Sequence, residues 1–121
     1  MTPSLSAALT GRRIETLRCG PEPLLDLSDG LLIRIAGDFR LAGPRGVEHY
    51  YPGLVTHPTG GLKRLPGSLI TEAGTTLAGA LVLTLDSGLT LTVPPDSTDR
   101  PWQVANPAGP LFTALPGGYT T

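Results

Sequence analysis

The chain has 121 residues, of which 40% are hydrophobic and only 5% aromatic, and it contains 16 glycines and 13 prolines. This length suits one domain, residues 1–121, and so much glycine and proline excludes a helical bundle and favours short strands joined by turns. The formal net charge is −1, with nine basic and ten acidic residues spread along the chain, which gives no electrostatic basis for binding nucleic acid or an anionic membrane.

Cysteine content and the N-terminal segment narrow the class of protein further. Cys19 is the single cysteine, which excludes an intrachain disulfide and a cysteine metal cluster. The opening segment, MTPSLSAALTGRR, has no basic region followed by an apolar run, and no segment reaches membrane-spanning length. We therefore expect a cytoplasmic protein without a signal peptide. Lys63 is the only lysine beside many arginines, which indicates a high-GC coding bias.

Along the chain, the first predicted element is a short helical turn at residues 3–9. Ser4 or Ser6 suits its N-cap, and Gly11 is the residue that would end it. A strand is predicted next, at residues 12–19, before a turn rich in proline and glycine.

The first hairpin is predicted at residues 23–35, PLLDLSDGLLIRI. Apolar and polar residues alternate there on both sides of Asp29-Gly30, which is typical of two strands with one buried face. Phe39 and Leu41 indicate a short strand after it. Residues 47–56 suggest one more extended segment, broken by a Pro-Gly pair.

Residues 81–93, LVLTLDSGLTLTV, carry the most regular pattern of the chain. A three-residue loop pairs Leu85 with Leu89 and places every leucine on one face, whereas a two-residue loop would mix apolar and polar residues on both faces. Because a slip of one residue turns every side chain to the other face, we predict the three-residue loop, with Gly88 in the left-handed position of a G1 bulge.

The remaining segments give weaker signals. Residues 57–61 are predicted to be a linker, residues 62–65 one helical turn, and residues 68–75 a strand. Two prolines end the second hairpin because they cannot continue a strand ladder. The final two strands are expected within residues 102–115.

The two hairpins match one another when Gly30 is laid on Gly88, and Leu9-Thr10-Gly11 matches Leu65-Pro66-Gly67. We interpret residues 5–41 and 62–95 as an internal duplication. The alternative is two independent hairpins that share only their type. The predicted fold is mainly β, with about eight short antiparallel strands in a pseudo-symmetric sandwich or partly open barrel. Each half would contain a short helical turn, a strand and a hairpin.

The order of these motifs resembles a family of small, uncharacterised actinobacterial proteins that share a domain of unknown function. The resemblance covers nearly the whole chain, and it implies a source and a fold layout but no activity. Where such proteins carry Asp-Gly in the second hairpin, this chain has Ser87-Gly88. The residues that carry the resemblance are Gly11, Asp29-Gly30, Gly67, Gly88, Trp102, Val104, Pro107, Gly109 and Pro116-Gly117-Gly118.

Sequence signatures of common catalytic and cofactor sites are absent. The chain contains no GxxxxGK[ST], GxGxxG, HExxH, CxxC or GxSxG segment. Arg18 next to Cys19 would favour a thiolate, but the histidines that would act as base are distant in sequence, so a structural role for this cysteine is favoured. The carboxylates suit solvated or turn-forming positions. We expect no catalytic residue, no metal and no cofactor.

The densest polar and aromatic cluster is Glu48-His49-Tyr50-Tyr51, followed by His57. Histidine and tyrosine can transfer protons, two histidines with a glutamate can bind a metal, and exposed aromatic rings suit a protein interface. However, strand alternation places His49 and Tyr50 on opposite faces, which argues against one shared site. An ordinary loop or edge strand is the favoured interpretation, with a protein-contact patch next.

A second candidate surface is the outer side of the second hairpin, formed by Val82, Thr84, Thr90 and Thr92 and called here the threonine face. It is uncharged, whereas the first hairpin carries Asp26 and Arg34 at the matching positions. Trp102 is the only tryptophan; a core position is favoured for it, and an exposed binding residue is the alternative. The candidate interaction patch therefore comprises His49, Tyr50, Tyr51, His57, Thr84, Thr90, Thr92 and Trp102.

Two functional classes remain open after this reading. The favoured class is a non-catalytic protein-interaction module, such as an immunity, antitoxin-like or regulatory partner, that binds another protein or itself as a homodimer. The alternative is a small-ligand binder or enzyme that uses a pocket near residues 49–57. We expect neither nucleic acid nor a membrane as a partner.

Overall fold

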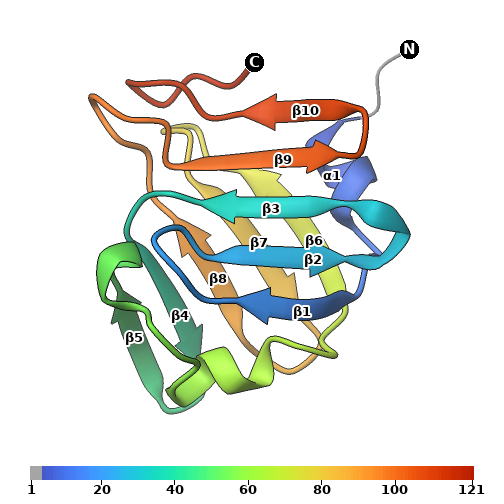
Figure 1. Ribbon diagram of the computed structural model, residues 1–121, viewed down its shortest axis with the longest axis vertical. Helices are drawn as coiled ribbons and strands as arrows, with labels where there is room; N and C mark the ends of the chain where they lie inside the picture. The colour runs from blue at the N-terminus through green and yellow to red at the C-terminus, as the bar shows by residue number, and fades with distance from the viewer. Residues whose placement is uncertain (1–3) are drawn as a thin grey trace.

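The computed structural model describes residues 4–121, and in them ten strands form two antiparallel five-stranded sheets (Figure 1). The strands are β1 Ile14–Arg18, β2 Leu24–Leu27, β3 Leu32–Ile35, β4 Phe39–Gly43, β5 Gly46–Tyr50, β6 Ile70–Thr75, β7 Leu81–Leu85, β8 Thr90–Val93, β9 Trp102–Asn106 and β10 Gly109–Thr113. The helical elements are α1 Leu5–Leu9 and the 3-10 turns η1 Ser28–Gly30, η2 Pro52–Leu54 and η3 Gly60–Arg64.

The two sheets pack face to face as a sandwich, and the described strands do not close into a barrel. The first sheet has the strand order β1-β2-β3-β9-β10, and the second has the order β5-β4-β8-β7-β6. The predicted mainly-β fold is confirmed, and the sandwich is the correct one of its two alternatives. The structure has ten strands where about eight were expected, and all ten lie in segments predicted from the sequence to be extended.

Each half of the chain contributes to both sheets. Strands β1–β3 are extended in their sheet by β9 and β10 from the second half, and β6–β8 are extended by β4 and β5 from the first half. Where the halves meet, the amide of Gly11 donates to the carbonyl of Ile70 at 2.7 Å. In the matching position, the amide of Gly67 donates to the carbonyl of Ile14, also at 2.7 Å. The internal duplication itself stays a prediction.

Both hairpins have the register that alternation predicts. In the second, Leu83 pairs with Leu91 and Thr84 pairs with Thr90, and the amide of Leu85 donates to the carbonyl of Leu89 across the loop. The three-residue loop is therefore confirmed. Gly88 has a φ of 89°, a value that side chains strongly disfavour, so glycine is required there.

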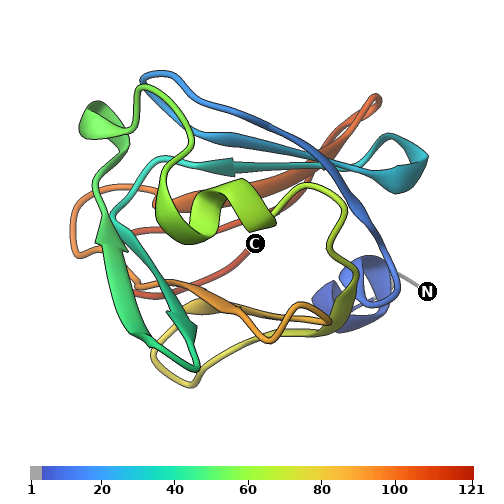
Figure 2. The same ribbon diagram turned by 90° about the horizontal axis from the view of Figure 1, so that it is seen from below.

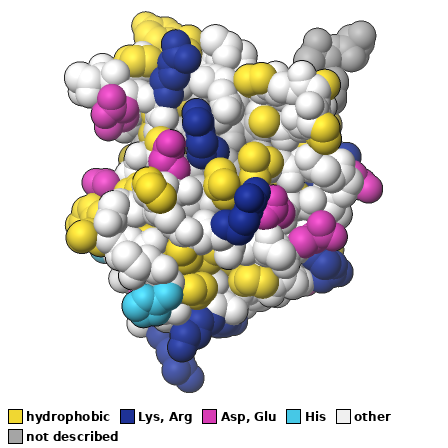
Figure 3. Space-filling view, in the orientation of Figure 1, with side chains coloured by type: hydrophobic (Ala, Val, Ile, Leu, Met, Phe, Trp, Pro, Cys, Tyr) yellow, Lys and Arg dark blue, Asp and Glu magenta, His cyan; other side chains and the backbone are white. Residues whose placement is uncertain are grey.

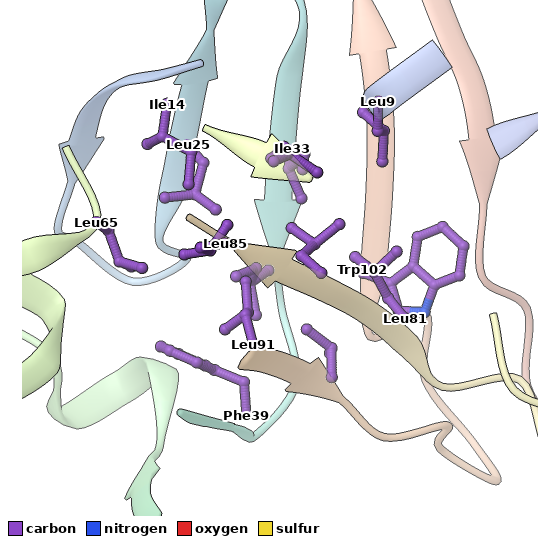
Figure 4. Packing of buried hydrophobic residues seen from close by; sticks show 14 of the residues in the cluster. Leu9, Ile14, Leu25, Ile33, Phe39, Leu65, Leu81, Leu85, Leu91 and Trp102 are labelled. Atoms are coloured by element: carbon purple, nitrogen blue, oxygen red, sulfur yellow. The ribbon is translucent and has the colours of Figure 1, made fainter. Parts of the chain in front are cut away.

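The hydrophobic core lies between the sheets and draws on both of them. Figure 4 shows Ile33 of the first sheet and Leu91 of the second pointing into this shared layer, together with Trp102. All three side chains are at most 1% exposed. Burying one large apolar side chain contributes roughly 1.5–3 kcal/mol, so this layer is the main source of stability.

Short helical elements close the ends of the sandwich. In α1, the Ser4 hydroxyl accepts a hydrogen bond from the amide of Ala7, so the predicted turn and its cap are confirmed for the described residues; residues 1–3 lie outside them. The turn η3 crosses one end between the two sheets (Figure 2), where Leu62 is fully buried. No helix within residues 4–121 is long and apolar enough to cross a membrane.

Candidate functional site

Strand β5 separates the residues of the predicted polar and aromatic cluster. Tyr50 is buried, and its ring stacks on Phe39 with the centroids 5.2 Å apart and the planes at 20°. His49 lies on the opposite side of the strand and is exposed. The prediction that these two residues occupy opposite faces is therefore correct. It follows that Tyr50 belongs to the core and does not form part of a surface patch, which corrects its place in the candidate list.

Tyr51 and His57 do not complete a site around His49. Both side chains are exposed, and the Nδ1 atom of His57 lies 3.1 Å from the hydroxyl of the neighbouring Thr56. A shallow hollow of about 210 Å³ borders His49 and Tyr51, but His57 does not line it. Within residues 4–121, no three side chains of the metal-binding types gather into a group that could hold an ion.

Glu48 is the residue of this cluster whose role the sequence did not reveal. Its Oε1 atom accepts a hydrogen bond from the amide of Gly61 at 2.9 Å, and its Oε2 atom accepts one from the hydroxyl of Tyr50 at 2.9 Å. Burial and the adjacent Glu48 carboxylate raise the pKa of Tyr50 to about 12. The carboxylate thus fixes the linker around η3 onto the edge of the second sheet.

Two glycines make room for the Glu48 carboxylate. A Cβ on Gly60 would lie 2.0 Å from Oε2 of Glu48, and a Cβ on Gly61 would lie 2.8 Å from Oε1. Both distances are far shorter than a van der Waals contact. The available sequence signals were the period of two, which puts Glu48 on the side of Tyr50, and the Gly-Gly pair itself, which was interpreted only as a linker.

Beside this carboxylate lies a half-open cavity of about 520 Å³, between the β4–β5 hairpin and η3. Leu41 and Leu89 form its floor but are only 1% and 4% exposed, and the exposed Pro44 and Val47 contribute to its apolar wall. Arg45 and Arg64 line it together with Glu48, and much of the remaining wall is glycine. This volume is in the range of small-molecule pockets. The cavity is called here the Glu48 cavity.

The threonine face forms the middle of the outer surface of the second sheet. One cross-strand row contains Arg40, Thr92 and Val82, and the next contains Ala42, Thr90 and Thr84. Val82, Thr84 and Thr90 are half-buried by their neighbours, whereas Thr92 is 9% exposed and therefore buried. The face is thus positioned as predicted, except that Thr92 offers little surface for contact.

Charged residues border the threonine face on two sides. His49 pairs with Arg40 across β5 and β4, and Glu72 pairs with Thr84 across β6 and β7. The basic residues therefore lie toward one edge of the sheet, and the acidic residue lies toward the other. The centre between them is uncharged.

The outer surface of the first sheet has a different character. Figure 3, which looks onto it, shows basic and acidic side chains next to one another across the strands. Arg18 donates to both carboxylate oxygens of Asp26, at 2.9 and 3.0 Å. The Thr16 hydroxyl also donates to Asp26, and this hydrogen bond together with Arg18 holds the pKa of Asp26 below its usual value. On this side, Arg18 is thus paired with Asp26, and Arg34 lies 3.7 Å from Glu22.

Residues 5–121 match the family of unknown function DUF6188. The chain belongs to this family. No curated protein and no solved structure matches the chain. The family match assigns no activity to it.

Trp102 of this DUF6188 domain belongs to the core. It begins β9, pairs with Ile35 and is 1% exposed, so the favoured reading of this residue is correct and its inclusion in the candidate interaction patch is wrong. Its position follows from alternation along β9, because Val104 two residues later is also buried. The part of the patch that remains at the surface is His49, Tyr51, His57, Thr84 and Thr90.

Proposed function

We propose that this chain is a non-catalytic protein-interaction module and that the threonine face is its contact surface. The observation that carries the proposal is the contrast between the two sheets. At matching hairpin positions, the first sheet exposes Asp26 and Arg34, whereas the second carries Thr84 and Thr92. An uncharged β-surface in the middle of a sheet can be covered by a partner without leaving a buried charge unpaired.

The partner that fits this surface is a second copy of the chain. A two-fold axis parallel to the strands would reverse the strand order across the interface and place β5 of each copy over β6 of the other. Arg40 and His49 of each copy would then lie over β7 and β6 of the other, one cross-strand row along the strands from Glu72. The charges that border the threonine face are therefore self-complementary in this arrangement, and complementary charge sets the register of an interface.

The size of the sheet predicts a weak dimer. Five strands of about five residues cover a planar area of roughly 20 by 17 Å, or about 350 Å². Stable complexes bury about 800 Å² on each partner. We therefore expect a weak dimer that dissociates on dilution.

The test is the molar mass in solution of the wild type and of Thr84→Arg/Thr90→Arg, measured by light scattering and sedimentation over a concentration series. The two threonines pair directly across β7 and β8, so two arginines would place repelling charges at the centre of the interface. The matched control is Leu32→Arg/Ala105→Arg, a cross-strand pair on the outer side of the first sheet. Single Thr90→Arg guards against a loss of folding, which circular dichroism would reveal.

A dimer that dissociates in the threonine variants and persists in the control supports the proposal. A wild type that stays monomeric throughout the series would refute the second copy as partner. A dimer unaffected by Thr90→Arg would refute the threonine face. An immunity or regulatory partner of different sequence is the remaining occupant, and it would have to compete for the same two threonines.

The cellular setting belongs to the same proposal. The predominance of arginine over lysine and the resemblance described above support an actinobacterial origin, and the lone cysteine agrees with a cytoplasmic location.

A further inference from the structure

Glu48 lies on the same side of β5 as the buried Tyr50, at a position where the other sheet carries an apolar residue, although Glu48 itself is exposed. Leu41 on β4 and Val104 on β9 occupy matching positions in the two sheets. Leu41 pairs with Leu91 of the second hairpin, and Val104 pairs with Ile33, the matching residue of the first hairpin. Glu48 is the strand partner of Leu41, and Phe112 is the strand partner of Val104. Phe112 packs against the core. In the second sheet, a carboxylate and an open cavity take the place of that phenyl ring.

The Glu48 carboxylate is fixed in place but has no cationic partner of its own. The amide of Gly61 and the hydroxyl of Tyr50 each satisfy one lone pair, and a carboxylate can accept about four hydrogen bonds. Within residues 4–121, the ion pairs within 4.0 Å join Arg12 to Asp29, Arg18 to Asp26 and Arg34 to Glu22. Glu48 therefore retains acceptor capacity toward a positively charged group.

The opposite charge lines the same cavity. Arg64 is anchored by a hydrogen bond from its Nη2 atom to the carbonyl of Ser87 at 2.8 Å, and its other guanidinium nitrogens remain for further acceptors. Arg45 projects from the tip of the β4–β5 hairpin and also lines the cavity. Arginine forms geometrically matched pairs with carboxylates. Between these groups, Pro44 and Val47 contribute exposed apolar residues to the wall, whereas Leu41 and Leu89 are only 1% and 4% exposed and lie beneath Gly43 and Gly61.

We propose that the Glu48 cavity binds a small zwitterion with an apolar side chain, of the size of one or two amino-acid residues. Its ammonium group pairs with Glu48, its carboxylate pairs with Arg45 or Arg64, and its apolar group lies against Pro44 and Val47. The cavity of about 520 Å³ accommodates such a molecule. An anion alone would be repelled by Glu48, and a cation alone would leave the arginines unpaired, so the zwitterion satisfies all three features.

The probes are L-leucine and L-leucyl-L-leucine, added to ¹⁵N-labelled protein while the amide signals of Gly43, Gly60 and Gly61 are followed by NMR. Two analogues separate the contributions: 3-methylbutylamine lacks the carboxylate of leucine, and 4-methylpentanoate lacks its ammonium group. We expect saturable shifts with leucine or the dipeptide, and at least about tenfold weaker binding for either analogue.

The substitution Glu48→Gln removes the negative charge, but the amide oxygen of the new glutamine can still accept a hydrogen bond. The fold should therefore be retained, and recognition of the ammonium group should be lost. Glu15→Gln, on the exposed side of β1, is the matched control and should bind like the wild type. Arg45→Gln tests the carboxylate contact at a residue that makes no internal ion pair within the described chain.

Three results would overturn the proposal. The first is no saturable shift with either zwitterion at about 10 mM, a concentration well above a millimolar dissociation constant. The second is equal binding of leucine and both analogues, and the third is equal binding by Glu48→Gln and Glu15→Gln. Loss of binding in Glu48→Gln with retention in Glu15→Gln, and weakened binding in Arg45→Gln, would support it.

Discussion

The C-terminal tail meets the β6–β7 loop backbone to backbone, and this contact gives the sharpest stability prediction. Gly118 has a φ of 91° and Gly79 a φ of 99°. A Cβ built on Gly118 would lie 2.1 Å from the carbonyl oxygen of Ala78, and one built on Gly79 would lie 2.1 Å from the carbonyl oxygen of Gly118. The neighbouring atoms are backbone, so no side-chain rotation can relieve either contact.

The substitution Gly118→Ala is expected to destabilise the protein by about 2–5 kcal/mol. A carbon atom approaches a carbonyl oxygen to about 3.3 Å, so the tail and the loop would have to separate by about 1.2 Å. A side chain at this φ costs roughly 1–2 kcal/mol. If the tail detaches, the bonds from Gly117 to Asp96 and from Leu115 to Tyr119 are lost, at about 0.5–1.5 kcal/mol each.

Thermal and urea unfolding would measure this effect against two control glycines. Gly88→Ala meets a φ of 89° with no atom within 4 Å, and Gly20→Ala meets neither a positive φ nor a contact. For a domain of this size about 1 kcal/mol corresponds to about 4 °C, so Gly118→Ala should lower the melting temperature by about 8–20 °C and Gly88→Ala by about 4–8 °C. Gly20→Ala should hardly change it. A loss in Gly118→Ala no larger than in Gly88→Ala would show that the backbone contact is not formed.

Two further predictions concern pH. The pKa of Asp26 is held below its ordinary value of 3.8 by Thr16 and Arg18, so Asp26 stabilises the fold above that value and the contribution disappears as the pH falls below it. The unfolding free energies of wild type and Asp26→Asn in urea should therefore differ at pH 7, and the difference should shrink as the pH falls below 3.8. The pKa of Tyr50 is raised from 10.0 to about 12 by burial and Glu48, so stability should fall between those values as the pH rises. Tyr50→Phe should lose about 1 kcal/mol at neutral pH but lack this alkaline decrease; an equal decrease in both proteins would contradict it.

The features that could be predicted from the sequence are the buried face and the pairing register of strands that follow one another directly in a hairpin. Leucine–threonine alternation determines which face of residues 81–93 is buried, and a loop of three residues is the one that keeps the leucines together. The hairpin register followed directly. In contrast, the pairing of β4 with β8 and of β3 with β9 joins segments about 50 to 70 residues apart. No local pattern encodes which sheet such a segment extends.

The candidate site shows the same division. Alternation correctly placed Thr84 and Thr90 outside and separated His49 from Tyr50. The Glu48 cavity was not predicted, because it exists only when residues 57–61 fold back over the sheet edge and bring Gly61 to Glu48. A segment without hydrophobic periodicity gives no indication of where it returns, and the Gly-Gly pair was its one usable signal.

Both proposed surfaces lie on the second sheet, on its opposite faces. Along β5, Glu48 faces the core side with its partner Leu41, and His49 lies on the outer side with its partner Arg40. Because successive side chains of a strand point to opposite faces, a ligand in the Glu48 cavity and a second copy on the threonine face would not compete for one side chain. Glu48→Gln should therefore leave the dimer intact, and Thr84→Arg/Thr90→Arg should leave the leucine-induced shifts intact. The first sheet, with Phe112 filling its core-facing position and Arg18 paired with Asp26 on its outer side, offers neither surface.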